Sequence, residues 1–341
     1  MQQCEWYGKP YYSLDAWCRN TLSHKCYKIA LNAHMTCPNR DGTLDTRGCI
    51  FCSAGGSGDF AVDIAEKNVE TQLAEGLSRL RDKFSADGTA CLIAYFQAYT
   101  NTYAPVEYLR KIYTEALDCP MVCGISIGTR PDCLPEEVLR LLQELKNAYP
   151  HKFIWIELGL QTIHEKTADF IRRGYALSCF EEACEKLSAM DIPVIVHLIL
   201  GLPGETEAMM LESIDYLNDR SPFGVKLQLL HFLKGTDLGK LYLRSINYIT
   251  TEKVEWDSSR SPVGHNPHAG LALTPLTQEE YLQILIDCIR RLSPEIVIHR
   301  LTGDGPRKSL IAPTWSLNKR NVLNSLHRQM KLLNARQGDM L

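Results

Sequence analysis

The sequence predicts an α/β protein whose parallel strands form a partial (β/α)6 TIM-like barrel, with an extension at each end. Short apolar runs alternate with amphipathic stretches along the chain, and this alternation is typical of a parallel sheet covered by helices. Six such β/α units run from about residue 27 to residue 235. Because a closed TIM barrel needs eight units, we expect a barrel that is open on one side.

Three segments follow from this pattern: an N-terminal extension over 1–26, the partial barrel over 27–235 and a C-terminal extension over 236–341. The barrel strands are expected at the apolar runs 27–31, 92–97, 122–127, 153–158, 194–200 and 225–230. Residues 236–275 interrupt the alternation with Pro262, Gly264, Pro267 and Pro275, and we expect an irregular excursion there. Beyond it we expect a helix over 281–292, a further strand over 296–299 and a helix over 318–333.

The helices between the strands are predicted from apolar residues that recur every three or four positions. Four apolar faces of this kind are marked by Val69, Leu73, Leu77, Leu80 and Phe84; by Leu109, Ile112 and Ala116; by Val138, Leu141, Leu142 and Leu145; and by Met210, Ile214 and Leu217. We expect these faces to pack against the sheet.

Composition indicates a globular protein of the reducing cytoplasm. The chain has 341 residues and is 45% hydrophobic, and its longest apolar run is broken by Pro193 and His197, so we expect no membrane span. The first residues form neither a basic region nor an apolar core, and we expect no export signal. Thirteen cysteines without such a signal argue against a disulfide framework. Seven cysteines are predicted to fill the core: Cys91, Cys119, Cys123, Cys133, Cys179, Cys184 and Cys288.

Cys37, Cys49 and Cys52 lie in a polar loop directly after the first predicted strand, with the spacing C-x11-C-x2-C. Three thiolates can hold a four-iron cluster and leave one iron without a protein ligand, free to bind a small molecule. A pair of the form C-x2-C is weak evidence alone in a chain with this many cysteines. A zinc site also remains open, with His34 or Cys26 as its fourth ligand.

Polar side chains recur where five successive predicted strands end. They are Gln97 and Tyr99, the segment 126–132, Glu157 and Gln161, His197, and Gln228 with His231. Ligands of parallel α/β proteins bind at the carboxyl ends of strands. Any one of these residues could serve a turn or the core, but five in succession predict a ligand site.

The net charge of −3 does not indicate a nucleic-acid partner, yet the C-terminal part is basic. Between residues 299 and 336, Asp304 is the one acidic residue, and the basic residues are Arg300, Arg307, Lys308, Lys319, Arg320, Arg328, Lys331 and Arg336. Such a strip can dock phosphates. A solvated helix with scattered charge is the alternative.

Six motifs resemble those of the radical SAM superfamily, and most closely those of its YhcC/YtqA (MnmL-like) family, which is related to the Elongator-like and coproporphyrinogen-dehydrogenase-like branch. The motifs are CPNRDGT from Cys37, YFQAYTNTY from Tyr95, GTRPD from Gly128, ELGLQ from Glu157, GLPGET from Gly201, and RLTGDGPR from Arg300 with Trp315 following. The resemblance extends over about 12–332.

The resemblance implies a [4Fe–4S] cluster on Cys37, Cys49 and Cys52, with S-adenosylmethionine (SAM) on the open iron. One electron from the cluster would break the sulfonium bond and release a 5′-deoxyadenosyl radical. An electron donor such as flavodoxin or ferredoxin would supply that electron.

The resemblance also implies contacts with SAM. The backbone of Gln97 to Tyr99 would receive the methionine ammonium, Arg173 would pair with the methionine carboxylate, and Gln161 would make a polar contact. His197 would meet the ribose, and Gly201 to Pro203 would face the adenine. Because Gly128 replaces a glutamate that is common in the superfamily, Glu157 or Ser126 would also contact the ribose. From the residues alone, Arg173 could lie on a surface helix and His197 in the core.

Members of the resembled family are associated with the wobble uridine of tRNA, where a carboxymethylaminomethyl group is converted towards an aminomethyl group. The resemblance therefore implies tRNA as the partner, with the basic tail and Trp315 docking it. Two alternatives stay open. One is a radical SAM enzyme with a small-molecule or protein substrate, and the other is a non-enzymatic iron–sulfur or zinc protein.

Overall fold

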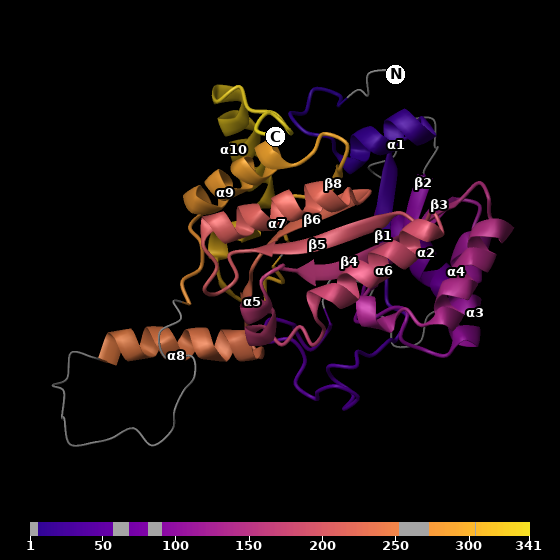
Figure 1. Cartoon of the computed structure of the whole chain (residues 1–341), viewed down its shortest axis with the longest axis horizontal. Helices are drawn as coiled ribbons and strands as arrows, with labels where there is room; N and C mark the ends of the chain where they lie inside the picture. Colours follow the sequence, from indigo (N-terminus) through magenta and orange to yellow (C-terminus); the bar gives the residue numbers. More distant parts are fainter. Residues whose placement is uncertain (1–5, 57–67, 81–90, 252–272, 304) are drawn as a thin grey trace.

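A seven-stranded parallel sheet forms the centre of the computed structural model, which describes residues 6–56, 68–80, 91–251, 273–303 and 305–341. The strands lie in the order β1-β2-β3-β4-β5-β6-β8 (Figure 1). They are β1 (Cys26–Leu31), β2 (Cys91–Phe96), β3 (Val122–Thr129), β4 (Phe153–Gln161), β5 (Val194–Leu200), β6 (Gly224–Leu229) and β8 (Val297–Arg300). The six predicted barrel strands are confirmed, and so is the partial barrel.

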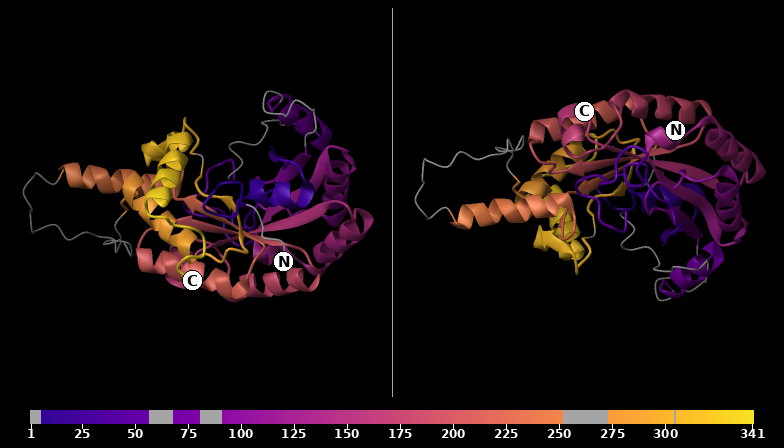
Figure 2. Two further views of the ribbon diagram at one scale, coloured as in Figure 1. Left: turned by 90° about the horizontal axis from the view of Figure 1, so that it is seen from above. Right: turned by 90° about the horizontal axis from the view of Figure 1, so that it is seen from below.

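The helices that connect successive strands lie along the outer, convex side of the curved sheet (Figure 2). They are α2 (Val69–Ser78), α3 (Val106–Asp118), α4 (Glu136–Ala148), α5 (Glu165–Phe170), α6 (Leu177–Ala189) and α7 (Glu207–Arg220). The predicted apolar faces of α3, α4 and α7 are buried in one core with the sheet, and Phe84 lies outside the described residues. Within the described ranges, no helix is long and apolar enough to cross a membrane.

The C-terminal extension contributes to the sheet. The further strand predicted over 296–299 is confirmed as β8, which pairs with β6 from Gly224 and Val297 onward and is the seventh strand of the sheet. The helices α9 (Gln278–Arg291) and α10 (Lys319–Leu332) are confirmed. A two-stranded antiparallel sheet of β7 (Phe232–Leu233) and β9 (Leu310–Ala312) was not predicted.

The prediction that residues 236–275 are irregular is wrong in its first part. Helix α8 (Asp237–Thr251) begins directly after Thr236, whose hydroxyl oxygen accepts a hydrogen bond from the Gly239 N–H at 3.0 Å. The prediction placed the end of regular structure too early because it relied on the prolines, and all of these lie after the helix. Residues 252–272, with Pro262, Gly264 and Pro267, lie outside the described residues.

Aromatic side chains fill the amino-terminal end of the half-barrel. Trp155 on β4 is buried, stacks on Phe153 at 3.9 Å between ring centroids, and packs against Phe223 at 5.1 Å. Trp17, from helix α1 (Leu14–Leu22), meets Trp155 edge-on at 5.0 Å. The N-terminal extension therefore packs across this end, and ligands must enter at the carboxyl ends of the strands.

The prediction of seven core cysteines holds fully for two of them and in part for Cys119, Cys123 and Cys184, which pack against the core. Cys133 and Cys288 are buried, whereas Cys91, Cys119, Cys123, Cys179 and Cys184 are half-buried. A periodic apolar pattern does not separate these two environments, because it indicates which face of an element packs inward and not how completely each side chain is covered.

Candidate active site

A cavity of about 550 Å³ lies at the carboxyl ends of the barrel strands, within the usual size range of small-molecule sites. Among its lining residues are Cys37, Cys49, Cys52, Gln97, Tyr99, Glu157, Gln161, Arg173 and His197. Gln228 and His231 line it as well. Among the predicted site residues, Ser126 and the adenine-facing segment 201–203 are absent from the lining. The sheet therefore brings residues from segments far apart in the chain to one site.

The cysteine loop, residues 37–52, is held in place by backbone hydrogen bonds to two later segments. The Ile50 N–H donates to the Ile171 carbonyl oxygen at 3.1 Å. The Leu238 N–H, at the start of α8, donates to the Ile50 carbonyl oxygen at 2.9 Å. Helix α8 thus supports the loop that carries the three thiols.

Asn39 fixes the loop from within. Its side chain is buried, and its amide donates to the carbonyl oxygens of Arg172 at 2.9 Å and Arg173 at 3.1 Å. The same amide nitrogen lies 3.6 Å from the Cys49 sulfur. An N–H donor beside a sulfur stabilises the thiolate form that binds iron.

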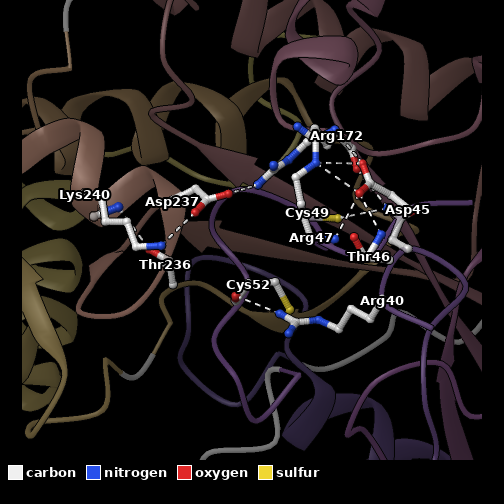
Figure 3. Close-up of polar contacts among 12 residues, drawn as sticks. Arg40, Asp45, Thr46, Arg47, Cys49, Cys52, Arg172, Thr236, Asp237 and Lys240 are labelled. Carbon is white, nitrogen blue, oxygen red and sulfur yellow. Dashed lines mark hydrogen bonds and ion pairs between the residues drawn. The ribbon is translucent and has the colours of Figure 1, made fainter. Parts of the chain in front are cut away.

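Arg40 braces the other side of the loop. Its guanidinium donates to the carbonyl oxygens of Cys52 at 2.9 Å and Ser53 at 2.7 Å, and Figure 3 shows it directed at Cys52. A Cβ atom on Gly48 would lie 2.9 Å from the Arg40 Nε, and Gly48 has a φ of +73°. Glycine is therefore needed at this position for both space and conformation.

The Cys49 thiol is protonated when no metal is bound. Burial raises its pKa to about 12 and the neighbouring Cys52 adds to the rise, while the Arg130 guanidinium opposes it. Because iron binds the thiolate, loading of the site must release this proton.

The fourth ligand proposed for a zinc site is absent from this cavity. Cys26 is the first residue of β1, at the amino-terminal end of the half-barrel, so it lies at the opposite end of the strand from the cysteine loop. His34 is exposed and does not line the cavity. In the described part of the chain, no fourth cysteine lines the cavity, which suits a cluster with one open iron.

Glu157 is at the centre of a buried polar network on the cavity floor. Its Oε1 accepts hydrogen bonds from the Lys28 ammonium and the Ser126 hydroxyl, both at 2.6 Å. Its Oε2 contacts the His197 Nε2 at 2.7 Å and pairs with the Lys226 ammonium. Ser126, predicted as a ribose contact, therefore holds Glu157 instead of facing the cavity.

The floor carries more positive than negative charge. Burial alone would raise the pKa of Glu157, but Lys226 and Lys28 outweigh it and hold that pKa well below its ordinary value. Burial lowers the pKa of Lys226, and Lys28 and Arg300 add to the effect. The Glu157 carboxylate thus pairs with Lys28 and Lys226 while Arg300 lines the same cavity, and an anion bound here would relieve the repulsion among these basic side chains.

His197 gives this floor a measurable pH dependence. Burial lowers its pKa to about 4, helped by Lys226 and opposed by Glu157, whereas an unfolded histidine titrates near pH 6.5. The neutral imidazole therefore adds stability above about pH 6.5, and this contribution is lost as the pH falls towards 4. We expect it to cost about 2 kcal/mol of unfolding free energy between pH 7 and pH 5. Urea unfolding of the metal-free protein measures this, and a His197→Gln variant with an unchanged pH slope would contradict it.

Arg173 is buried, and its guanidinium is engaged within the protein. Its Nη1 donates to the carbonyl oxygens of Leu160 at 3.2 Å and Thr162 at 2.7 Å, and its Nε donates to Tyr175 at 3.0 Å. Its Nη2 forms an ion pair with Glu165 at 3.2 Å. Because Nη2 contacts both carboxylate oxygens of Glu165, all five N–H groups of the side chain have partners, and the burial of Arg173 excludes the surface-helix alternative. Pairing with a methionine carboxylate stays a prediction that requires one of these bonds to be exchanged.

Two further predicted residues have the left-handed backbone that favours glycine. Tyr99 has a φ of +61°, and its N–H donates to the Gly56 carbonyl oxygen at 2.9 Å. Gln161 has a φ of +67° and follows an irregularity in the pairing of β4 with β5. Non-glycine residues in this conformation are often held there for function, since the strain must be compensated elsewhere. Gly201, predicted to face the adenine, does not line the cavity.

Sequence reasoning missed the cationic side chains of the floor. Lys28, Lys226 and Arg300 all line the cavity, and Lys226 is buried. The available signal was a lysine at an inward position of an otherwise apolar strand, in the runs Tyr27 to Leu31 and Val225 to Leu230. Such a lysine is rarely buried unless it is paired.

The profile of the Radical SAM superfamily matches residues 46–217, and that of the Radical_SAM C-terminal domain matches residues 268–332. The half-barrel with three cysteines on one cavity and this match define a radical SAM protein, an enzyme class that uses a [4Fe–4S] cluster and SAM. YtqA of Bacillus subtilis is 40% identical over 330 residues, which are 97% of this chain and 92% of that protein. YhcC of Escherichia coli K12 is 32% identical over 90% of this chain and 87% of its own length. The chain belongs to the YtqA/YhcC family of the radical SAM superfamily.

Two more distant similarities concern the fold and one segment of the chain. The structure of Elp3 from Methanocaldococcus infernus, lacking residues 1–46, superposes with a TM-score of 0.63 at 15% identity, and the match covers 92% of this chain and 64% of that one. The tRNA uridine(34) acetyltransferase of Methanocaldococcus jannaschii is 29% identical over 129 residues, which are 37% of this chain and 22% of that protein.

Proposed function

We propose that this radical SAM enzyme acts on the wobble uridine of tRNA and converts a carboxymethylaminomethyl group to an aminomethyl group. The observation that carries the proposal is the cation-rich cavity floor, where Lys28 and Lys226 pair with the carboxylate of Glu157 and Arg300 lines the same cavity. The group to be removed ends in a carboxylate, and a buried site with surplus positive charge favours that form.

Cys37, Cys49 and Cys52 would hold the cluster, and the bound cluster and SAM would supply a 5′-deoxyadenosyl radical to abstract hydrogen. The chain positions the substrate. Its lysines would bind the carboxylate and hold the neighbouring methylene group near the cofactor. Loss of the carboxymethyl group as glyoxylate is a two-electron oxidation followed by hydrolysis, and the reductive cleavage of SAM balances those electrons.

Cations beside the cavity support a tRNA partner. Pro306 lines the cavity, and the two residues after it, Arg307 and Lys308, are exposed where an RNA backbone could dock. The segment similarity to a tRNA uridine(34) acetyltransferase agrees with such a substrate. The tRNA would be modified in the cytoplasm.

The predicted role of Trp315 in docking RNA stays a prediction. Its ring is half-buried and lies 5.5 Å from the Tyr281 ring, and its Nε1 donates to the Leu276 carbonyl oxygen at 3.0 Å. A base could stack on the part of the ring that is exposed, and the cationic side chains would supply the contacts with phosphate.

Profiling of tRNA nucleosides in a strain without the gene tests the proposal. We expect carboxymethylaminomethyl uridine to accumulate at the wobble position and aminomethyl uridine to fall. A plasmid with the wild-type gene should restore the profile, whereas one carrying Cys49→Ala should not. Wobble nucleosides that are unchanged by the deletion would contradict the proposal.

An assay of SAM cleavage by the reconstituted protein distinguishes this function from the alternatives. We expect it to form 5′-deoxyadenosine from SAM under reductant and to do so faster with tRNA from the deletion strain. Formation without any tRNA effect would indicate another carboxylate-bearing substrate. A protein that neither binds iron nor cleaves SAM would be a non-enzymatic metal module.

A further inference from the structure

We propose that Cys26, Cys91 and Cys123 form a second metal site, for a single thiophilic ion such as Zn²⁺, at the amino-terminal end of the half-barrel. Their sulfur atoms all lie within 4.8 Å of one another. Among the residues that the structure describes, this is the one group of three or more His, Cys, Asp or Glu side chains whose ligand atoms all lie within this distance of one another. The three cysteines of the cavity do not form a group of this kind.

Strand pairing explains why these three residues meet. Cys26 and Cys91 are the first residues of adjacent strands and are direct partners in the register of β1 with β2. The pairing of β2 with β3 shifts between Leu92 and Ile93, so that Cys123 is an extra residue without a partner. Bulges of this kind turn a side chain away from its regular direction. The Cys123 sulfur lies 3.1 Å from the Leu92 carbonyl oxygen, on the side of Cys91.

The spacing of the sulfur atoms suits one ion rather than a cluster. Four ligands at the usual zinc–sulfur distance of about 2.3 Å form a tetrahedron with edges of about 3.8 Å. The distances between the sulfur atoms are at most 4.8 Å, which is close to the length of that edge. Small rotations of the three side chains would therefore place the sulfur atoms at the corners of a tetrahedron. Iron–sulfur clusters hold their cysteines farther apart, because several iron atoms lie between them.

The three thiols are accessible to an ion from solvent. Cys26, Cys91 and Cys123 are all half-buried, whereas Cys18, on the neighbouring helix α1, is buried. His24, two residues before Cys26, is exposed and close enough to Cys91 for electrostatic interaction. The fourth position is therefore open to His24 or to water.

The proposed site is distinct from the active site. Cys26 and Cys123 pack against the aromatic cluster around Trp155 at the amino-terminal end of the half-barrel, whereas the active-site cavity lies at the carboxyl ends of the strands. From Cys26 to Leu31 the strand rises about 16 Å, at 3.3 Å per residue, before the chain enters the cysteine loop. Because β1 is an edge strand, an ion shared with β2 and β3 would fasten the strand that carries the cysteine loop.

Cobalt binding to a variant that lacks the cluster tests the site. Cys37→Ala, Cys49→Ala and Cys52→Ala are combined so that metal bound in the active site cannot contribute, and circular dichroism checks the fold. We expect the reduced protein to bind about one Co²⁺ per chain, with the thiolate-to-cobalt charge-transfer band and visible bands of a tetrahedral site. Zinc should displace the cobalt and remove these bands.

Single substitutions assign the ligands. Adding Cys26→Ser, Cys91→Ser or Cys123→Ser should remove most of the charge-transfer band, whereas the control Cys119→Ser should leave it unchanged. Less than about 0.1 equivalent of bound cobalt, or a band that survives all three substitutions, would overturn the proposal. So would a disulfide among the three in protein isolated without air.

A second measurement covers variants that fold poorly. Zinc should raise the Tm of the protein lacking the cluster ligands, since it binds the folded state. Chelator should reverse the rise, and a Tm unaffected by zinc would overturn the site. Because no SAM or tRNA is present, failure here leaves the proposed function intact, and loss of tRNA activity leaves this site intact.

Discussion

Replacing Cys37 by alanine should abolish iron loading and SAM cleavage. A cluster of four irons on three thiolates cannot keep its geometry when one ligand is lost. We expect anaerobic reconstitution to fall from about four irons per chain to less than about a tenth of that, with 5′-deoxyadenosine formation lost in proportion. Iron and sulfide analysis and chromatography of the nucleoside measure both quantities.

Cys37 is the most informative position for this test. The superfamily profile begins at residue 46, so of the three cavity cysteines it includes Cys49 and Cys52 but not Cys37. The assignment of the first ligand therefore depends on its place in the cavity. Cys179→Ala is the matched control, since Cys179 is a half-buried cysteine on α6 outside the cavity lining. Full iron content in Cys37→Ala would mean that another residue is the third ligand.

Replacing Lys226 by methionine should lower turnover of the tRNA substrate by about 100-fold or more. Truncation of one member of a buried charge pair that also binds a ligand costs roughly 2–5 kcal/mol. Glu157 remains ionised in this variant because Lys28 still pairs with it at 2.6 Å. SAM cleavage without substrate should persist, because Lys226 acts on the substrate and not on the cluster.

Two comparisons separate substrate binding from general damage. Lys186→Met removes an exposed lysine from α6 and should leave turnover unchanged. A tRNA whose carboxymethyl group is a neutral methyl ester should react poorly with both wild-type and Lys226→Met proteins, since the ion pair with the carboxylate is already absent. If the ester reacts as well as the acid with wild-type protein, the cationic floor does not recognise the carboxylate.

The strands could be predicted because their apolar runs are continuous. A strand buried on both faces, such as Val194–Leu200, needs no partner to be identified, since burial alone determines its composition. Helix α8 was missed because prolines and a glycine beyond Thr251 dominated the interpretation of the whole segment. Where an irregular segment begins depends on packing, which the local sequence does not show. Helix α8 is stabilised because its Leu238 packs into the core beside the cysteine loop.

The cavity residues could be predicted as a group because parallel strands bring their carboxyl ends to one edge. Their partners could not be predicted. Ser126 and Glu157 follow the same alternation as their neighbours, yet both are fully buried and bonded to each other. Which polar side chain faces a ligand and which one supports it depends on the curvature of the sheet, and curvature leaves no mark on local periodicity.

Local composition and the order of elements along the chain were enough to predict the half-barrel, the loop with three cysteines and the edge of the sheet at which ligands bind. Two features became visible only in the folded sheet: Lys28 and Lys226 share one carboxylate, and Cys26, Cys91 and Cys123 converge. Those contacts join residues more than 30 positions apart. They follow from strand register and one bulge, which arise from packing of the whole sheet.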